Sequence, residues 1–102
     1  MNKLLGKWNV LTKTPMGDTK AVWTIKEENG ILSGNLSTEG TNTPWESIHI
    51  EGNYFEMKIS IQLPFGLTSY VMEGEYSEED DTFTGISKMK MGKSKFKGKR
   101  AQ

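Results

Sequence analysis

Short segments of alternating apolar and polar residues, separated by turn-forming residues, are the feature that most constrains this fold. The clearest such segment covers residues 54–62. Its apolar side chains occupy every second position: Phe55, Met57, Ile59 and Ile61. A period of two residues places alternate side chains on opposite faces of a β-strand. The chain is therefore predicted to be all-β, because it has no helical apolar period long enough to compete.

Eight segments of this kind are predicted as strands, and the turns between them set their order. They cover residues 6–14, 19–27, 31–37, 45–51, 54–62, 67–76, 82–89 and 95–100. Asn29-Gly30 is the strongest hairpin signal among the turns. Because every connection is short, neighbouring strands are expected to be antiparallel. We predict an eight-stranded antiparallel up-and-down meander barrel, since closure removes open sheet edges; a flattened sandwich is the alternative.

A tryptophan in the first strand and an arginine in the last indicate where the barrel closes. In a closed antiparallel barrel these two strands are neighbours. The guanidinium group of Arg100 is therefore expected to stack on the indole of Trp8, and burial makes such a cation–π contact worth about 2 kcal/mol.

The two ends of a meander barrel receive alternate turns, and here the ends differ in chemistry. The end that holds both termini also holds an acidic turn at residues 78–81. Inward-pointing side chains are expected to plug it: Trp8, Tyr76, Phe83, Phe96 and Arg100. Glycines at similar heights are expected to leave room for these rings: Gly74, Gly85 and Gly98.

The opposite end carries apolar residues at its loop tips: Met16, Phe65 and Met91. Water normally selects polar residues at such positions, so these tips predict a mouth or a partner surface. The alternative is that Met16 and Phe65 fold back to cap the core.

Below this mouth, the inward positions form a candidate lining for a small apolar ligand. The candidate ligand-binding residues are Thr12, Met16, Trp23, Ile61, Phe65, Tyr70, Met72 and Met89. Methionines suit an adaptable apolar pocket, but they suit an ordinary core equally well. An eight-stranded barrel is either filled by its own side chains or holds one small ligand. Replacing Trp23 by alanine separates these cases, because a core tryptophan affects only stability.

A Gly-x-Trp pattern at Gly6 and Trp8, with Arg100 near the end of the last strand, resembles the calycin superfamily of lipocalin-like, fatty-acid-binding-like and streptavidin-like barrels. The length is nearest that of streptavidin-like and the smallest lipocalin-like members. The resemblance implies that Gly6, Trp8 and Arg100 form a structural closing signature. The chain is also similar to bacterial β-barrel domains of uncharacterised function. It departs from the better-known families in having no disulfide, no helix-turn-helix lid and no recognisable set of biotin contacts.

The composition offers little for catalysis. The 102 residues fit one domain, covering residues 1–102. Cysteine is absent, which excludes disulfides, thiolate metal sites and a cysteine nucleophile. His49 is the only histidine and is predicted to point outward, so no catalytic triad and no metal or cofactor site is expected. We expect a non-enzyme; the lack of cysteine and of a signal peptide in this numbering favours the cytoplasm.

Charge is balanced overall but unevenly distributed. The chain has 13 basic and 13 acidic residues. An outward-facing stripe is predicted on the first strand and the last two strands: Lys7, Lys13, Lys88, Lys90, Lys95, Lys97 and Lys99. No aromatic residue is predicted among these lysines, so nucleic acid is not the expected partner. A membrane is not expected as a partner either. An acidic partner or a solvated, aggregation-resistant face is consistent with the stripe.

Two functions are consistent with the sequence. The first is a non-catalytic lipocalin-like barrel that binds a small, largely apolar ligand in its upper half. The alternative is a structural or interaction module with a filled barrel, which docks a protein partner or a second copy through its apolar loop rim or its basic face.

Overall fold

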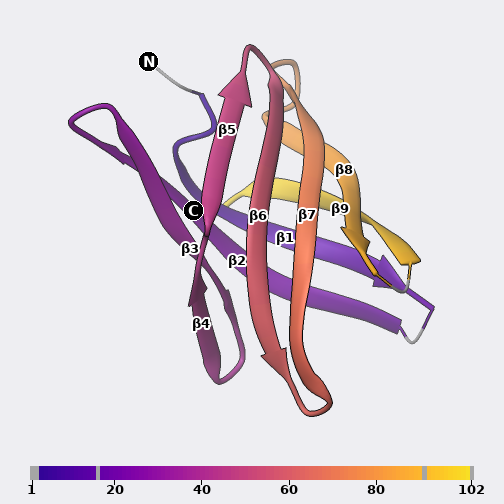
Figure 1. Cartoon of the computed structure of the whole chain (residues 1–102). Helices are drawn as coiled ribbons and strands as arrows, with labels where there is room; N and C mark the ends of the chain where they lie inside the picture. The colour runs from indigo at the N-terminus through magenta and orange to yellow at the C-terminus, as the bar shows by residue number, and fades with distance from the viewer. Residues whose placement is uncertain (1–2, 16, 91, 102) are drawn as a thin grey trace.

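The computed structural model describes residues 3–15, 17–90 and 92–101 of the chain, and this part is all antiparallel β-structure (Figure 1). The strands are β1 (Gly6–Thr14), β2 (Gly17–Glu28), β3 (Ile31–Thr38), β4 (Thr41–Pro44), β5 (Ser47–Glu51), β6 (Tyr54–Leu63), β7 (Gly66–Ser77), β8 (Thr82–Met89) and β9 (Gly92–Arg100). They form one sheet in the order β4-β3-β2-β1-β9-β8-β7-β6-β5. The all-β prediction and the up-and-down connections are therefore confirmed.

The predicted seam between the first and last strands is confirmed. β1 pairs with β9 in an antiparallel ladder, and Trp8 lies directly opposite Arg100. The same ladder continues through Val10 opposite Gly98 to Lys13 opposite Lys95. The first and last strands thus lie side by side in the middle of the sheet.

Two predictions about the barrel were wrong. The described residues form nine strands instead of eight, because residues 41–44, predicted as loop, pair with β3 as a separate strand. The sheet is also not closed, since β4 and β5 form its two edges. The curled sheet brings these two edges near each other (Figure 1). The body is therefore barrel-like, but β4 and β5 are not paired with each other.

The break between β4 and β5 has a local cause at Pro44-Trp45-Glu46. The Trp45 amide donates to the Gly34 carbonyl at 3.1 Å, whereas the Glu46 amide donates to the Lys58 carbonyl at 2.8 Å. The chain therefore leaves β3 and joins β6 within one residue. Pro44 has no amide hydrogen to donate to a ladder and suits an edge strand. Trp45 is buried at this corner, where its indole donates to the Thr24 carbonyl at 3.3 Å.

Aromatic rings fill the centre of the body. Their centroids lie 4.8 to 6.3 Å apart, within the range of favourable ring pairs, and the rings belong to Trp8, Trp23, Trp45, Phe55, Tyr76, Phe83 and Phe96. Smaller buried side chains complete the core: Leu4, Val10, Ile25, Leu36, Met57, Ile59 and Met72. The inward direction predicted for Trp8, Trp23, Tyr76, Phe83 and Phe96 is confirmed, whereas Trp45, which alternation places outward, is buried.

Each core phenylalanine lies directly opposite a glycine on the neighbouring strand. The pairs are Phe55 with Gly74, Phe96 with Gly85, and Phe83 with Gly98. A Cβ atom on Gly98 would lie 2.3 Å from Cζ of Phe83, closer than two carbon atoms can approach without a shift. The prediction that these glycines make room for rings is therefore confirmed.

Candidate functional site

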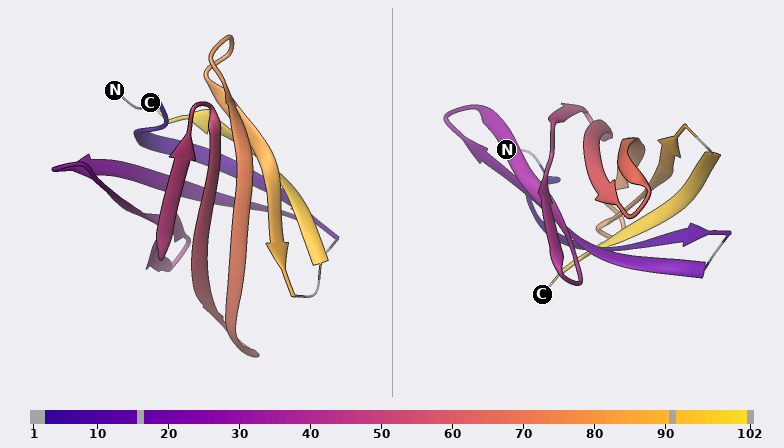
Figure 2. Two further views of the ribbon diagram at one scale, coloured as in Figure 1. Left: turned by 45° about the horizontal axis from the view of Figure 1, so that its top comes forward. Right: turned by 60° about the horizontal axis from the view of Figure 1, so that its bottom comes forward.

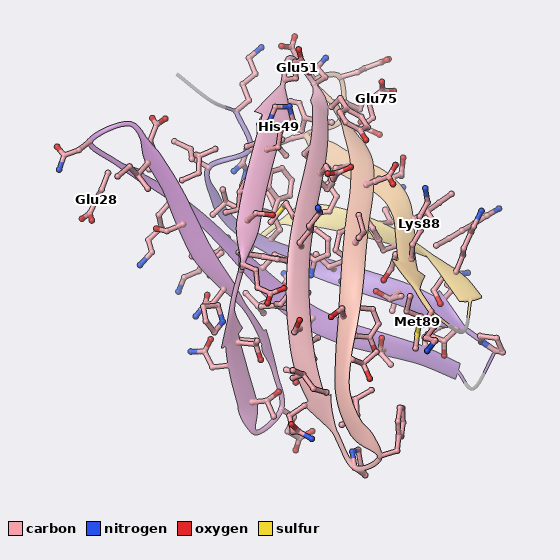
Figure 3. The ribbon with its side chains drawn as sticks, viewed as in Figure 1. Glu28, His49, Glu51, Glu75, Lys88 and Met89 are labelled. Carbon is pink, nitrogen blue, oxygen red and sulfur yellow. The ribbon has the colours of Figure 1, made fainter. Side chains whose placement is uncertain are left out.

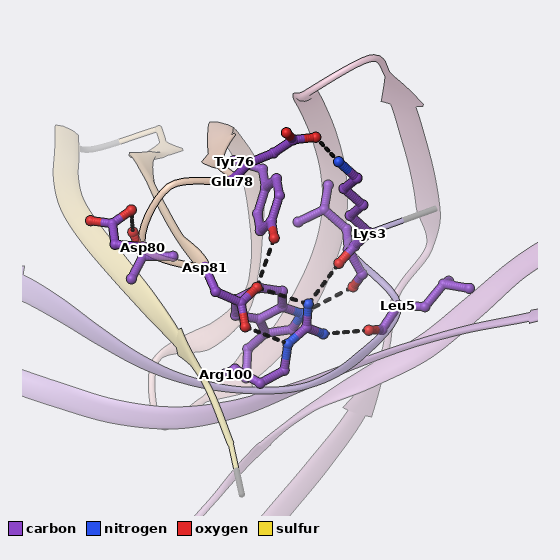
Figure 4. Close-up of polar contacts among 10 residues, drawn as sticks. Lys3, Leu5, Tyr76, Glu78, Asp80, Asp81 and Arg100 are labelled. Carbon is purple, nitrogen blue, oxygen red and sulfur yellow. Dashed lines mark hydrogen bonds and ion pairs between the residues drawn. The ribbon is translucent and has the colours of Figure 1, made fainter. Parts of the chain in front are cut away.

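Arg100 closes the end of the body that holds the N-terminal segment (Figure 4). Its guanidinium carbon lies 4.0 Å from the centroid of the Trp8 ring, as predicted from the sequence. Nε and Nη2 donate to the two carboxylate oxygens of Asp81 at 3.1 and 3.0 Å. Nη1 donates to the Leu5 carbonyl at 2.5 Å, and Nη2 also donates to the Lys3 carbonyl at 2.8 Å. Every contact is internal, so Arg100 fixes the N-terminal segment and the acidic turn to β9.

Gly6 contributes to the same closure. Its φ of 122° lies in a region that favours glycine, and a Cβ atom there would lie 2.9 Å from Nη1 of Arg100. Gly6 thus leaves room for the guanidinium group over Trp8.

The pKa values of Asp81 and Tyr76 in this cluster are shifted in opposite directions. Hydrogen bonds from Arg100 and from the Tyr76 hydroxyl lower the pKa of Asp81. The Tyr76 hydroxyl donates to Oδ1 of Asp81 at 2.7 Å, and this bond together with burial raises the pKa of Tyr76. Both shifts favour the ionised carboxylate and the neutral phenol, which are the forms that the hydrogen bonds require.

The ligand lining predicted from the sequence divides into three groups. Trp23 and Met72 lie in the packed core, where only 1% and 6% of their surface is exposed. The Trp23 ring contacts four other rings, at centroid distances of 5.0 to 6.3 Å from Trp45, Phe55, Phe83 and Phe96. Both Trp23 and Met72 therefore pack inside the core.

A second group lies half-buried toward the predicted mouth: Thr12, Ile61, Tyr70 and Met89. Burial raises the pKa of the Tyr70 phenol. Met89 lies near the end of β8, as Figure 3 shows. Met16 and Met91 lie outside the described residues.

The third part of the predicted site is the tip of the β6–β7 hairpin, where Phe65 is 73% exposed. The alternative that Phe65 folds back over the core is therefore wrong. Leu67 on the outward face next to it is 68% exposed. The pairing of β7 with β8 ends at Val71 opposite Lys88, so the last residues of the β6–β7 hairpin project beyond β8 (Figures 1 and 2). We call Phe65 and Leu67 the hairpin rim.

Two hollows lie at the periphery of the body. One, of about 340 Å³, lies beside the closing cluster and is lined by Leu4, Ile50, Asn53 and Tyr76, among others. The larger, of about 1130 Å³, lies on the outer face of β3, β2, β1 and β9, and we call it the outer groove. Half-buried Leu11 and Val22 form its floor, and exposed Lys20, Lys97 and Lys99 border it.

The sequence does not predict the outer groove as a site, but the predicted lysine stripe contains two of its lining residues. Lys97 and Lys99 were predicted to face outward beside β1. Lys20 lies outside the predicted stripe, because alternation within a single strand does not give the register that places it opposite Leu11. A signal was present in the neighbouring apolar pairs Val10-Leu11 and Ala21-Val22. In a strand, one member of each such pair must point outward.

His49, the single histidine of the sequence, lies exposed on the sheet surface. His49 points outward from β5, and its Nε2 lies 3.5 Å from Oε2 of Glu51 on the same strand (Figure 3). Among residues 3–15, 17–90 and 92–101, no three His, Cys, Asp or Glu side chains are grouped so that they could hold a metal ion. The same part of the chain contains no helix long and apolar enough to cross a bilayer.

Comparisons with known proteins bear on the fold alone. No family model matches the chain, and no curated protein matches it. Among solved structures, the chain is similar to a redesigned β-barrel, with a TM-score of 0.71 and 9% sequence identity over 98% of this chain and 93% of that chain. At this identity the likeness supports a barrel-like fold. It carries no family assignment, so the calycin resemblance stays a prediction.

Proposed function

We propose that this protein is a non-catalytic interaction module with a filled, barrel-like body, which docks a protein partner through the hairpin rim. The observation that carries the proposal is the contrast between interior and tip. The aromatic centre is packed ring against ring, while Phe65 and Leu67 remain 73% and 68% exposed. A filled body directs binding to the outside.

The hairpin rim is suited to docking for two reasons. Apolar surface gains about 25 cal/mol for each Å² removed from water, so a partner that covers these two side chains gains binding energy. The rim also projects from the body, where a partner can reach it without displacing other strands (Figure 2). Exposed apolar patches of this kind commonly mark interaction sites.

A second candidate function is the binding of a small apolar ligand toward the predicted mouth. It is favoured by the half-buried side chains Thr12, Ile61, Tyr70 and Met89, which lie between the packed centre and the loop tips. Such a ligand would have to insert above Ile59, which is fully buried, because the space below belongs to the aromatic rings.

Affinity purification from the host, compared between variants, tests the proposal. The Phe65→Ser and Leu67→Ser double variant should lose the partner that the unaltered protein retains. Ile31→Ser is the matched control, because Ile31 is 69% exposed on the β2–β3 hairpin at the other end of the body. Retention of the same partner by the rim variant would contradict the proposal. A co-purifying small molecule, detected by native mass spectrometry and lost in Tyr70→Ala, would favour the second candidate instead.

A further inference from the structure

The outer groove combines an apolar floor with positive charge, and the strand register explains why. Leu11 on β1 lies directly opposite Lys20 on β2 and directly opposite Lys97 on β9. Two residues along, Asn9 lies opposite Val22 on one side and Lys99 on the other. Side chains so paired on one face are close neighbours. An apolar pair, Leu11 and Val22, is thereby bordered by three ammonium groups.

These three ammonium groups have no ion-pair partner among the described residues, whereas Lys3, Lys88 and Arg100 do. In addition to side-chain hydrogen bonds, the charge of Lys97 helps to lower the pKa of Asp80. Lys88 pairs with Glu73 at 2.8 Å, Arg100 pairs with Asp81 at 3.0 Å, and Lys3 pairs with Glu78. Glu39 is the one acidic residue in the groove lining. The groove therefore carries a net positive charge that a bound anion would neutralise.

The neighbouring surface adds to this charge at a cost to the fold. Lys13 on β1 lies directly opposite Lys95 on β9, and both are exposed on the same outward face as the groove lysines. Like charges placed directly opposite each other across two strands are destabilising. An acidic partner relieves this repulsion, so the cost in the free protein becomes a gain in the complex.

The dimensions of the outer groove fit a polypeptide segment. Its volume of about 1130 Å³ exceeds the roughly 300–1,000 Å³ typical of small-molecule sites. The groove spans four strands, or about 14 Å at 4.7–4.9 Å between neighbours, which an extended chain crosses in about four to five residues. The lining contains no aromatic ring on which a nucleic-acid base could stack.

We propose that the outer groove binds a short extended segment of an acidic protein, with its carboxylates on Lys20, Lys97 and Lys99 and its apolar side chains on Leu11 and Val22. This site lies on a different face from the hairpin rim, and its ligand class is independent of the function proposed above. Complementary charge steers such a segment to the groove and makes binding weaken as salt is added.

The test uses a fluorescein-labelled hexapeptide, Glu-Glu-Leu-Leu-Glu-Glu, titrated with the full chain at low salt and followed by fluorescence anisotropy. We expect saturable binding that the matched peptide Gln-Gln-Leu-Leu-Gln-Gln does not reproduce. The Lys20→Gln and Lys97→Gln double variant should bind roughly sevenfold more weakly, since exposed ion pairs contribute modestly. Leu11→Thr keeps a strand-forming residue and should weaken binding severalfold by removing part of the floor.

Lys58→Gln is the control variant, because Lys58 is exposed on β6, opposite Ser47 and Val71 and away from the groove. It should bind as the unaltered protein does. NMR spectra of the backbone amides check that each variant retains the fold. The proposal is overturned if the acidic peptide fails to bind, if Lys58→Gln weakens binding as much as the groove variant, or if the Gln peptide binds equally well. It is also overturned if single-stranded DNA, vesicles containing phosphatidylserine or a second copy of the chain occupies the groove lysines and the peptide does not.

Discussion

Replacing Trp23 by alanine is the change that most directly tests whether the body is filled. Trp23 is 1% exposed and contacts four other rings. A buried aromatic side chain removes about 150–250 Å² from water, and at about 25 cal/mol per Å² this is worth about 4–6 kcal/mol. That figure is an upper estimate, because unfolded chains are partly compact. Core Trp→Ala substitutions cost about 3–5 kcal/mol, so we expect a loss of about 4 kcal/mol in the free energy of unfolding.

Urea and thermal denaturation measure this loss. At about 2.1 cal/mol/K per residue, the unfolding entropy of 102 residues is about 0.2 kcal/mol/K, so a loss of 4 kcal/mol lowers Tm by about 20 °C. Phe65→Ala is the control, because a side chain that is 73% exposed should change stability by less than about 0.5 kcal/mol. A loss below about 1 kcal/mol for Trp23→Ala, with an unchanged urea m-value, would refute the packed centre.

The closing cluster and the glycine positions give further predictions. Gly98→Ala should lower the free energy of unfolding by about 1–3 kcal/mol, because the new methyl group collides with the Phe83 ring. In a Phe83→Leu background the same substitution should cost less, as measured by urea denaturation. An unchanged cost would contradict the contact. Asp81→Asn should lower stability at neutral pH by roughly 1 kcal/mol, a value reduced for the partial exposure of the pair with Arg100. Because the pKa of Asp81 is lowered on folding, its contribution is present above the ordinary aspartate pKa and is lost as pH falls through the lowered value. The acid-side slope of stability against pH should therefore flatten in Asp81→Asn, and an unaltered slope would count against the cluster. Because the pKa of Tyr76 is raised on folding, its neutral phenol stabilises the fold below the ordinary tyrosine pKa, and this contribution is lost as pH rises through the raised value. The free energy of unfolding of Tyr76→Phe should therefore fall less steeply with rising alkaline pH.

Much of the fold could be predicted from the sequence, because strand alternation and tight turns are local signals. The stripe from Phe55 to Ile61 set the inward face of one strand, and the pairing of Trp8 with Arg100 followed from the meander. The corner at Trp45 could not be predicted, since it depends on the chain leaving one partner strand for another. Alternation alone places Trp45 on the outward side with His49, whereas the corner buries it.

The candidate sites were only partly predictable for a related reason. Inward direction was assigned correctly for Trp23 and Met72, but direction does not tell whether the space beyond a side chain is empty or filled by rings. The outer groove depends on pairing register, which brings Lys20 and Lys97 to either side of Leu11. Register is set by all the turns together, so it becomes visible only when the strands are assembled.

The measurement that tests the account most directly is the response of tryptophan fluorescence when a small apolar probe is titrated into the purified protein. If the aromatic centre is filled, the probe has no internal site near Trp23, and the fluorescence should show no saturable change at micromolar probe. The same protein should bind the acidic hexapeptide through its outer face. Saturable quenching at micromolar probe that Trp23→Phe abolishes, in a variant that remains folded, would contradict the filled interior and restore the small-ligand function.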